Sequence, residues 1–212
     1  VTPNGPPAFS ATNSFKITVN EVNLPPSLPP QNNRVINELT QLLVNAGASD
    51  PDLPADDLTY QLLNPPAGPS VDSPGQITWT PSEAQGPGTY ILTTVVSDNN
   101  SPPLRATNSF SVTVNEVNTA PVLPAQSNRT INELTLLTIT NTASDSDLPA
   151  NDLSYQLLVG PAGADIDNSG VITWIPSEAQ GPGTYTFTTI ATDDGSPPLS
   201  STNSFTVTVA EL

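Results

Sequence analysis

The acidic side chains of this chain recur at fixed positions, and their type and spacing suit a chemical role. The 212 residues hold 20 acids against four bases, which gives a net charge of −16. Most of the acids recur 95 residues apart, at Glu21, Glu116 and Glu211, at Glu38 and Glu133, at Asp50 and Asp145, at Asp52 and Asp147, at Glu83 and Glu178, and at Asp98 and Asp193. Apart from Glu38 and Glu133, each lies at a predicted strand end or in a loop beside proline or glycine.

Carboxylates placed in this way suit a hard divalent cation. Calcium takes about six to eight oxygen ligands, which flexible loops supply well. An Asp-x-Asp turn such as Asp50 and Asp52 directs two carboxylates toward one point. Like charges gathered at one end of a domain repel one another unless a cation lies between them. The recurring set favours calcium sites, whereas any single acid also fits an ordinary solvated turn residue.

The composition argues against several other function classes. Phosphate binding needs clustered Lys and Arg, so this acidic chain is not expected to bind nucleic acid or an anionic membrane surface. No apolar run approaches the roughly 18 residues of a membrane span, so no membrane insertion is expected. Cysteine and histidine are absent, which excludes thiol catalysis and histidine-based metal motifs. We therefore expect no enzyme activity.

The segments that position the acids recur with the same 95-residue step. Thr12-Asn13-Ser14-Phe15 returns at 107–110 and again at 202–205, and the ten residues from Pro81 to Tyr90 return unchanged at 176–185. A period of this length suits a small autonomous domain rather than a solenoid unit. The sequence predicts repeat 1 at 23–117 and repeat 2 at 118–212. Residues 1–22 are expected to be the last strand of a preceding repeat plus a linker.

Apolar and polar residues alternate along most of each repeat, which is typical of half-buried strands. In one such segment Phe110, Val112 and Val114 point one way, with Ser109 and Thr113 opposite. The pattern predicts strands in repeat 1 near 33–37, 40–48, 57–63, 70–73, 76–80, 89–97 and 105–115, separated by proline and glycine turns. About seven strands in about 95 residues indicate an all-β, Greek-key β-sandwich of immunoglobulin-like type. Proline-rich linkers at 23–30 and 118–124 are stiff, so the tandem sandwiches are expected to form a rod.

Several motifs resemble those of cadherin repeats, and more closely the cadherin-like repeats of large bacterial surface proteins. Ile-Asn-Glu-Leu at 36–39 stands where cadherins carry Pro-Glu-Asn, and Ser82-Glu83 takes the place of Asp-Arg-Glu. Ala-Ser-Asp-Ser-Asp at 143–147 matches the Asp-x-Asp motif, and 191–200 is close to Ala-x-Asp-x-Gly-x-Pro-x-Leu-Ser. The linker Glu116-Val117-Asn118-Thr119-Ala120-Pro121 is a shortened form of Asp-x-Asn-Asp-Asn-x-Pro.

The resemblance implies that calcium ions lie at the joints between repeats. The joint between repeats 1 and 2 would use Glu38, Glu83, Glu116, Asn118, Asp145, Asp147 and Asp193. The joint before repeat 1 would use Glu21, Asn23, Asp50, Asp52 and Asp98, and the joint after repeat 2 would begin with Glu133, Glu178 and Glu211. Because the linker is shortened and Asp-Arg-Glu is reduced to one Glu, one or two ions per joint are expected rather than three.

The expected function is mechanical, as an extracellular repeat module of a bacterial surface protein. Calcium would stiffen it into a stalk, fibre or filament component, with adhesion as a further expectation. Its partners would be neighbouring copies or repeats of the same protein. The strand at 8–20 exposes Phe15, Ile17 and Val19 and is expected to pair outside this chain. Sequons at Asn99 and Asn128 leave glycosylation open.

Two other interpretations concern sugars. Trp79 and Trp174 fit either a sugar-stacking platform or a core position, and the alternation around them favours the core. Glu83 and Glu178 fit half of a glycosidase carboxylate pair, but identical copies in serial repeats argue against catalysis. The alternative function is a carbohydrate-binding accessory β-sandwich of a secreted protein.

Overall fold

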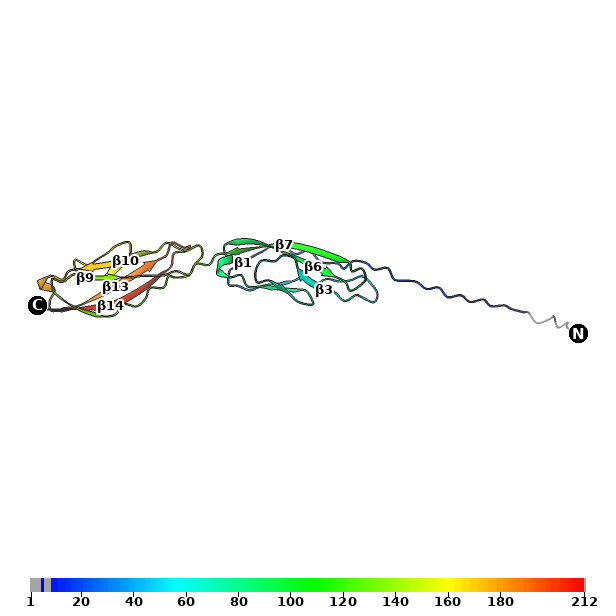
Figure 1. Cartoon of the computed structure of the whole chain (residues 1–212), viewed down its shortest axis with the longest axis horizontal. Helices are drawn as coiled ribbons and strands as arrows, with labels where there is room; N and C mark the ends of the chain where they lie inside the picture. The colour runs from blue at the N-terminus through cyan, green and yellow to red at the C-terminus, as the bar shows by residue number, and fades with distance from the viewer. Residues whose placement is uncertain (1–4, 6–8, 212) are drawn as a thin grey trace.

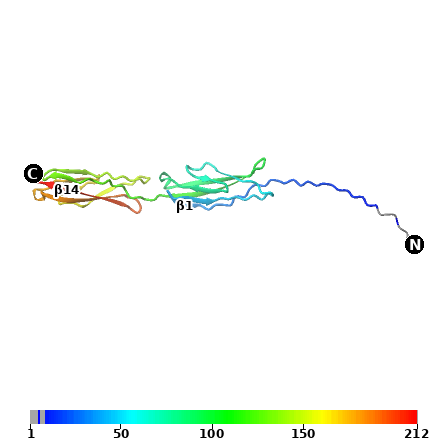
Figure 2. The same ribbon diagram turned by 90° about the horizontal axis from the view of Figure 1, so that it is seen from below.

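The chain forms two β-sandwiches that lie end to end, with an extended N-terminal segment leading away from repeat 1 (Figure 1). A view turned by a quarter circle shows the same arrangement (Figure 2). This computed structural model describes residue 5 and residues 9–211. Residues 1–4 and 6–8 of the predicted N-terminal segment and residue 212 of repeat 2 lie outside the described residues.

Repeat 1 contains seven strands in two sheets. They are β1 (Arg34–Asn37), β2 (Leu42–Asn45), β3 (Thr59–Leu62), β4 (Ser70–Val71), β5 (Gln76–Trp79), β6 (Gly88–Ser97) and β7 (Arg105–Asn115), with the 3₁₀ helix η1 (Glu83–Gln85) between β5 and β6. One sheet has the order β1-β7-β6-β3 and the other β2-β5-β4. Strand β1 runs parallel to β7, and the other pairs are antiparallel.

Repeat 2 has the same seven-strand arrangement. Its elements are β8 (Arg129–Asn132), β9 (Leu137–Thr140), β10 (Ser154–Val159), β11 (Asp165–Ile166), β12 (Val171–Trp174), β13 (Gly183–Thr192) and β14 (Ser200–Ala210), with η2 (Glu178–Gln180) after β12. Its sheets have the orders β10-β13-β14-β8 and β11-β12-β9. The predicted all-β fold of about seven strands per repeat is confirmed. The central strands are shorter than predicted; β2, for instance, spans four residues of the expected 40–48.

Each sandwich buries the apolar residues of its alternating strands. The core of repeat 1 includes Trp79, Leu92 and Phe110, and that of repeat 2 includes Trp174 and Phe187. A period of two sends alternate side chains to one face of a strand, so the apolar faces of both sheets meet. Both tryptophans are fully buried, which confirms the core prediction and excludes them as a sugar-stacking platform.

Each linker is tied to the sandwich that follows it. Ser27 and Ser49 exchange backbone hydrogen bonds of 2.7 and 3.0 Å, and Val122 and Ser144 do so with the same lengths. These bridges hold each linker beside its Asp-x-Asp loop. The fold therefore places the linker residues close to the acids at the N-terminal end of each repeat.

The N-terminal segment makes no strand pairing among residues 9–26. Phe15, Ile17 and Val19 are 82%, 72% and 87% exposed. Their counterparts in the last strand of repeat 1, such as Phe110, are buried in the core. Ala8 of the predicted strand 8–20 lies outside the described residues, and pairing of this segment with another molecule stays a prediction. None of the helices formed by the described residues is long or apolar enough to cross a membrane.

Candidate metal centre

Three glutamates meet at the C-terminal end of repeat 1. Glu38 follows β1, Glu83 opens η1 and Glu116 follows β7. Each offers a carboxylate oxygen, and these oxygens all lie within 4.8 Å of one another. Leu39 supports the arrangement with a left-handed backbone (φ 55°), and its N–H donates to the carbonyl of Pro81 at 2.9 Å. A non-glycine residue in this conformation is held by its surroundings, and here it joins the Glu38 turn to the segment that carries Glu83.

The glutamate cluster contains buried oxygens with unused hydrogen-bonding capacity. Glu38 is 2% exposed, and its Oε1 accepts a 2.9 Å bond from the N–H of Val117. Oε2 of Glu38 and both carboxylate oxygens of Glu116 are buried without a hydrogen-bond partner among the described residues. A Cβ atom at Gly86 would overlap the Glu38 carboxylate, so only glycine leaves room for it. Buried carboxylate oxygens left in this state suit a cation ligand set.

Burial and neighbouring charge both act on Glu116. Burial, followed by the negative charges of Glu38 and Glu83, raises the pKa of Glu116 to about 7. Asp147 of repeat 2 adds to this effect, which places its charge near the glutamates of repeat 1. A cation at this point would reverse the unfavourable electrostatics.

Repeat 2 presents its Asp-x-Asp loop to the same region. Asp147 is buried and accepts a 2.9 Å bond from the backbone N–H of Thr119, and its own N–H donates to Oδ1 of Asp145 at 2.9 Å. The N–H of Leu148 donates to Oε1 of Glu83 at 3.3 Å, a hydrogen bond between the two repeats. The second carboxylate oxygen of Asp145 is buried and unpartnered within the described part of the chain.

Asp193 and Asn118 form the other side of this joint. Asp193 is 3% exposed, and its Oδ1 accepts from Gly195 N, Leu199 N and Asn118 Nδ2 at 2.9–3.0 Å. Burial raises the pKa of Asp193, but the hydrogen bonds from Leu199, Asn118 and Gly195 outweigh it and leave the pKa below its usual value. Oδ2 of Asp193 has no partner among the residues described.

A second group of acids lies at the N-terminal end of repeat 1. Carboxylate oxygens of Asp50, Asp56 and Asp98 lie within 4.8 Å of one another. Asn23 Nδ2 donates to Asp98 Oδ2 at 3.2 Å, and Leu24 N donates to Asp52 Oδ2 at 3.0 Å. The structure therefore brings the predicted loop acids and the linker asparagine together.

Glu21 lies on the linker side of this group. Desolvation, followed by the negative charges of Asp52 and Asp56, raises the pKa of Glu21. Desolvation and the charges of Asp50, Asp52 and Asp98 raise the pKa of Asp56 in the same way. Both shifts indicate that carboxylates crowd this end of repeat 1.

The predicted residues at the far end of repeat 2 do not form such a group. Glu133 is buried, and a Cβ atom at Gly181 would overlap it as at Gly86. Glu178 at the start of η2 and Glu211 after β14 are exposed. Within residues 5 and 9–211, these three carboxylates are not among the groups whose oxygens meet within 4.8 Å.

The sequence reasoning missed Asp56, Asn100 and Asn151. Asp56 and Asn151 occupy the same position in the two repeats, so a search for recurring acids passes over them. Their shared oxygen-bearing side chain, a few residues after each Asp-x-Asp motif, is the signal that could have found them. The Asn100 amide donates to Asn23 Oδ1 at 2.8 Å, and the Asn151 amide donates to Asn118 Oδ1 at 2.8 Å.

Family comparisons agree with the fold of the two repeats. Residues 23–115 match the family described as "Bacterial Ig domain", and residues 117–210 match the one described as "Putative Ig domain". The chain consists of tandem immunoglobulin-like, cadherin-like repeats. No curated protein sequence matches the chain.

Solved cadherin structures share the fold of these cadherin-like repeats. A crystal structure of mouse cadherin-23 EC22-24 is 22% identical over 89% of this chain and 67% of its own, with a TM-score of 0.55. Human CDH23 EC21-23 is 20% identical over 88% of this chain and 64% of its own, also with a TM-score of 0.55. Protocadherin Gamma C5 EC1-3 is 20% identical over 90% of this chain and 70% of its own, with a TM-score of 0.53. Identities at this level show a shared architecture.

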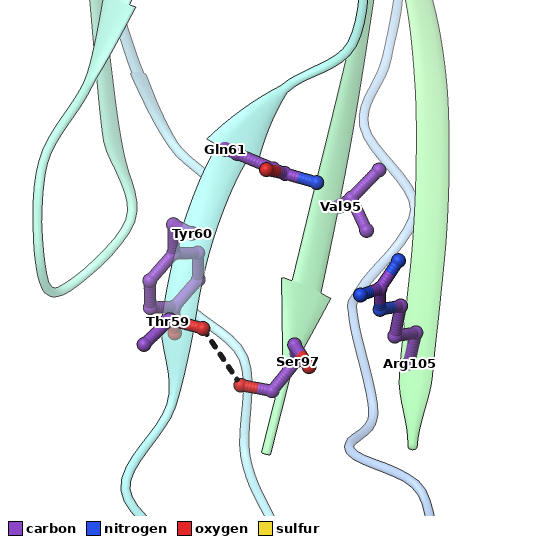
Figure 3. A pocket seen from close by; sticks show the side chains of 6 residues that line it. All are labelled: Thr59, Tyr60, Gln61, Val95, Ser97 and Arg105. Carbon is purple, nitrogen blue, oxygen red and sulfur yellow. Dashed lines mark hydrogen bonds between the residues drawn. The ribbon is translucent and has the colours of Figure 1, made fainter. Parts of the chain in front are cut away.

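A hollow of about 180 Å³ lies on the outer face of the β3-β6-β7 region of the first cadherin-like repeat (Figure 3). It is lined by Thr59, Tyr60, Gln61, Val95, Ser97 and Arg105. The Thr59 hydroxyl donates to the carbonyl of Ser97 at 3.2 Å. None of the six lining residues carries a carboxyl group, so this hollow offers no acid–base pair of the kind that glycosidases use.

Proposed function

We propose that this chain is part of a calcium-stiffened stalk or filament of an extracellular bacterial surface protein, in which adhesion is a further role. An immunoglobulin-like, cadherin-like repeat module fits a structural or adhesive function, and repeats of this kind are typically non-enzymatic. The observation that carries the proposal is the cluster of Glu38, Glu83 and Glu116, with Asp147 of repeat 2 close enough to raise the pKa of Glu116.

The proposal divides the chain at its linkers, into 1–22, 23–117 and 118–212. Carboxylate and amide oxygens from both repeats would hold calcium at the joint between them. The ligands proposed there are Glu38, Glu83, Glu116, Asn118, Asp145, Asp147 and Asp193. The corresponding sets are Glu21, Asn23, Asp50, Asp52 and Asp98 before repeat 1, and Glu133, Glu178 and Glu211 after repeat 2.

Calcium would stiffen the joint by linking carboxylates of repeat 1 to carboxylates of repeat 2. Without the ion, the negative charges of Glu116 and Asp147 repel each other across the linker. With the ion bound, both carboxylates share one positive charge centre, and their relative movement breaks ligand bonds. Extracellular calcium modules have dissociation constants of roughly 0.1–1 mM, so millimolar calcium outside a cell would fill such sites.

Neighbouring repeats or copies of the same protein are the proposed partners. The unpaired segment at 9–20 supports this, because its exposed Phe15, Ile17 and Val19 match positions that are buried in β7 and β14. Bacterial Ig domains are typically extracellular or surface-located, which agrees with the proposed location.

The distance between the two repeats tests the proposed stiffening. The chain has no cysteine, so spin labels can be placed at two matching exposed positions by Leu43→Cys and Thr138→Cys. We expect a narrow distance distribution in calcium and a broad one in EDTA or magnesium. The double change Asp145→Asn with Asp147→Asn should abolish the narrowing.

A matched control uses the second Asp-x-Asp pair of repeat 2. Asp165 and Asp167 lie in and beside β11, are exposed and belong to none of the three proposed joints. Asp165→Asn with Asp167→Asn removes the same charge and should keep the calcium response. Distance distributions of equal width in calcium and in EDTA would contradict the proposed function.

A further inference from the structure

The linker asparagine is held by a different amide in each repeat. In repeat 1, Oδ1 of Asn23 accepts a 2.8 Å hydrogen bond from the side chain of Asn100. In repeat 2, Oδ1 of Asn118 accepts a bond of the same length from the side chain of Asn151. Asn100 lies in the loop after β6, whereas Asn151 lies in the loop before β10. The two amides therefore approach the linker from different segments.

Two sequence differences between the repeats compensate each other. Gly195 stands in repeat 2 where Asn100 stands in repeat 1, and Asn151 stands where repeat 1 has Asp56. A Cβ atom at Gly195 would overlap the side chain of Asn118, so Asn118 occupies space that a larger residue would fill. An amide donor at 195 is thereby excluded, and residue 151 supplies it instead.

The exchange also changes the charge that faces the joint. Asp56 contributes a carboxylate oxygen to the group formed with Asp50 and Asp98, and its Oδ2 accepts a hydrogen bond from the Asn100 amide. Asn151 instead donates one hydrogen bond to Asn118 Oδ1 and another, of 3.0 Å, to Asp147 Oδ2. An amide NH₂ group that donates one N–H to each of two oxygens takes the place that a cation would take between them.

The remaining oxygens at this joint still point to a ligand. Asp193 is 3% exposed, and its Oδ2 has no hydrogen-bond partner in the described part of the chain. An unpaired carboxylate oxygen at this depth is costly, so a bound cation or another donor is expected beside it. The joint therefore offers oxygens that could bind a cation, and the Asn151 amide already donates hydrogen bonds to two of them, Asn118 Oδ1 and Asp147 Oδ2.

We infer that residue 151 sets the calcium affinity of the joint between the repeats, with asparagine holding it below the affinity that the aspartate found at position 56 would give. This inference rests on the proposed function. The number of charged ligands tunes the calcium affinity of oxygen-only sites. Replacing the Asn151 amide with a carboxylate adds one such ligand and removes the hydrogen bonds that Asn151 donates to Asn118 Oδ1 and Asp147 Oδ2. Asp147 Oδ2 keeps its bond from the Thr119 N–H.

The test is calorimetric titration of the full chain with calcium chloride, comparing the wild type with Asn151→Asp. We expect Asn151→Asp to tighten calcium binding by roughly tenfold, in line with the dependence of affinity on ligand charge. Asn151→Ala removes the amide without adding a charge and should not produce this tightening. Asn168→Asp, at an exposed position in the turn between β11 and β12, makes the same chemical change outside the joint and should leave the affinity as in the wild type.

The outcomes separate this inference from the proposed function. Calcium binding by the wild type with the same affinity in Asn151→Asp would overturn the inference alone. Binding by Asn151→Asp but not by the wild type would support the inference and overturn calcium stiffening of the native joint. Binding by neither would overturn both. Thermal unfolding in EDTA checks that each variant is folded, so a loss of structure is not mistaken for a loss of affinity.

Discussion

Repeat 1 and repeat 2 share one strand arrangement but fill their cores differently. Leu92 in repeat 1 corresponds to Phe187 in repeat 2, and both are fully buried. Phe187 stacks on Phe205 with ring centroids 5.2 Å apart and also meets Trp174 edge-on at 5.4 Å. The comparison shows that the period-two pattern determines the sandwich, whereas the size of each buried side chain is free to vary with its neighbours.

The loops that face the linkers differ in another way. Asp56 and Asn100 of repeat 1 correspond to Asn151 and Gly195 of repeat 2, and Asn99 corresponds to Asp194. The proposed ligands Asp50, Asp52 and Asp98 keep their carboxylates in repeat 2. The two repeats therefore carry the same residue at the loop positions that are proposed to bind the cation. They carry different residues at the positions whose side chains interact with the linker asparagine or its amide partner. The core and the joint can therefore be tested separately, because substitutions in one should leave the other intact.

The largest expected effect comes from removing a core tryptophan. Trp79→Ala and Trp174→Ala should each cost about 3–5 kcal/mol of the unfolding free energy of the repeat concerned. Trp174→Ala should cost more, because Trp174 meets two aromatic rings and its Nε1 donates to Ala162 O at 3.3 Å. Trp79 meets only Tyr90 among the aromatic rings described. Urea unfolding followed by circular dichroism measures both, and an equal or larger loss in Trp79→Ala would contradict the comparison.

A smaller effect is expected from exchanging the residue at which the two cores differ. Phe187→Leu gives repeat 2 the residue that repeat 1 uses, and it removes the stack with Phe205. We expect a loss of about 1–2 kcal/mol, from the lost aromatic contact and the reduced volume. Leu92→Phe in repeat 1 should also destabilise, because the larger ring has no prepared space. Differential scanning calorimetry tests the pair, and stabilisation by Leu92→Phe would show that the two cores are interchangeable.

Glu116→Gln should change stability in opposite directions with and without calcium. In EDTA the variant should unfold a few degrees higher, because a neutral amide removes a buried carboxylate that Glu38 and Glu83 repel. In calcium the variant should gain less than the wild type, because a proposed ligand is lost. Thermal unfolding in both buffers measures this reversal. Asp165→Asn, at an exposed position of strand β11, removes the same charge and serves as the control. Its effect on the unfolding temperature should not change sign between the two buffers.

The smallest expected effect concerns a turn in repeat 2. The hydroxyl of Ser169, followed by the N–H of Val171, lowers the pKa of Asp167, so the ionised form is favoured in the folded state. The ionised Asp167 carboxylate stabilises the fold at pH values above the ordinary aspartate pKa. This stabilisation is lost as the pH falls through the lower pKa that Asp167 has in the folded state. Asp167→Asn should therefore reduce the acid sensitivity of unfolding below about pH 4.

The matching turn of repeat 1 sharpens this test. Pro74 stands where repeat 2 has Ser169, so Asp72 has no such hydroxyl donor. Asp72→Asn should change the acid dependence less than Asp167→Asn does. Unfolding midpoints measured from pH 6 down to about pH 3 compare the two. An equal change in both variants would show that the Ser169 bond has no role.

Much of this fold could be predicted from the sequence, because the repeat and the alternation act over short distances. Ile77 and Trp79 share one face of a four-residue strand, so their burial follows from the period alone. The left-handed Leu39 could not be predicted in this way, because it depends on a contact with Pro81 from a distant segment.

The candidate site was only partly predictable for a related reason. A 95-residue recurrence identifies Glu38, Glu83 and Glu116 as a set, but it does not say which of them meet in space. The sequence analysis did not identify Asn151, because its role depends on how Asn118 packs against Gly195, where no side chain is in the way. Such packing cannot be inferred from the period of the sequence. Glu178 is exposed, whereas its counterpart Glu83 is half-buried beside Glu38. This difference also depends on packing around each glutamate and not on the repeat period.

The central claim is that calcium binds at the joint between the repeats, and thermal unfolding tests it most directly. At about 2 mM calcium and a dissociation constant of roughly 0.1–1 mM, one site should stabilise the folded state by about 0.6–1.8 kcal/mol, or several degrees. Magnesium should not reproduce the shift. Asp145→Asn with Asp147→Asn should abolish it, and Asp165→Asn with Asp167→Asn should retain it. The same midpoint in calcium, magnesium and EDTA would contradict the account and leave the recurring acids as solvated loop residues.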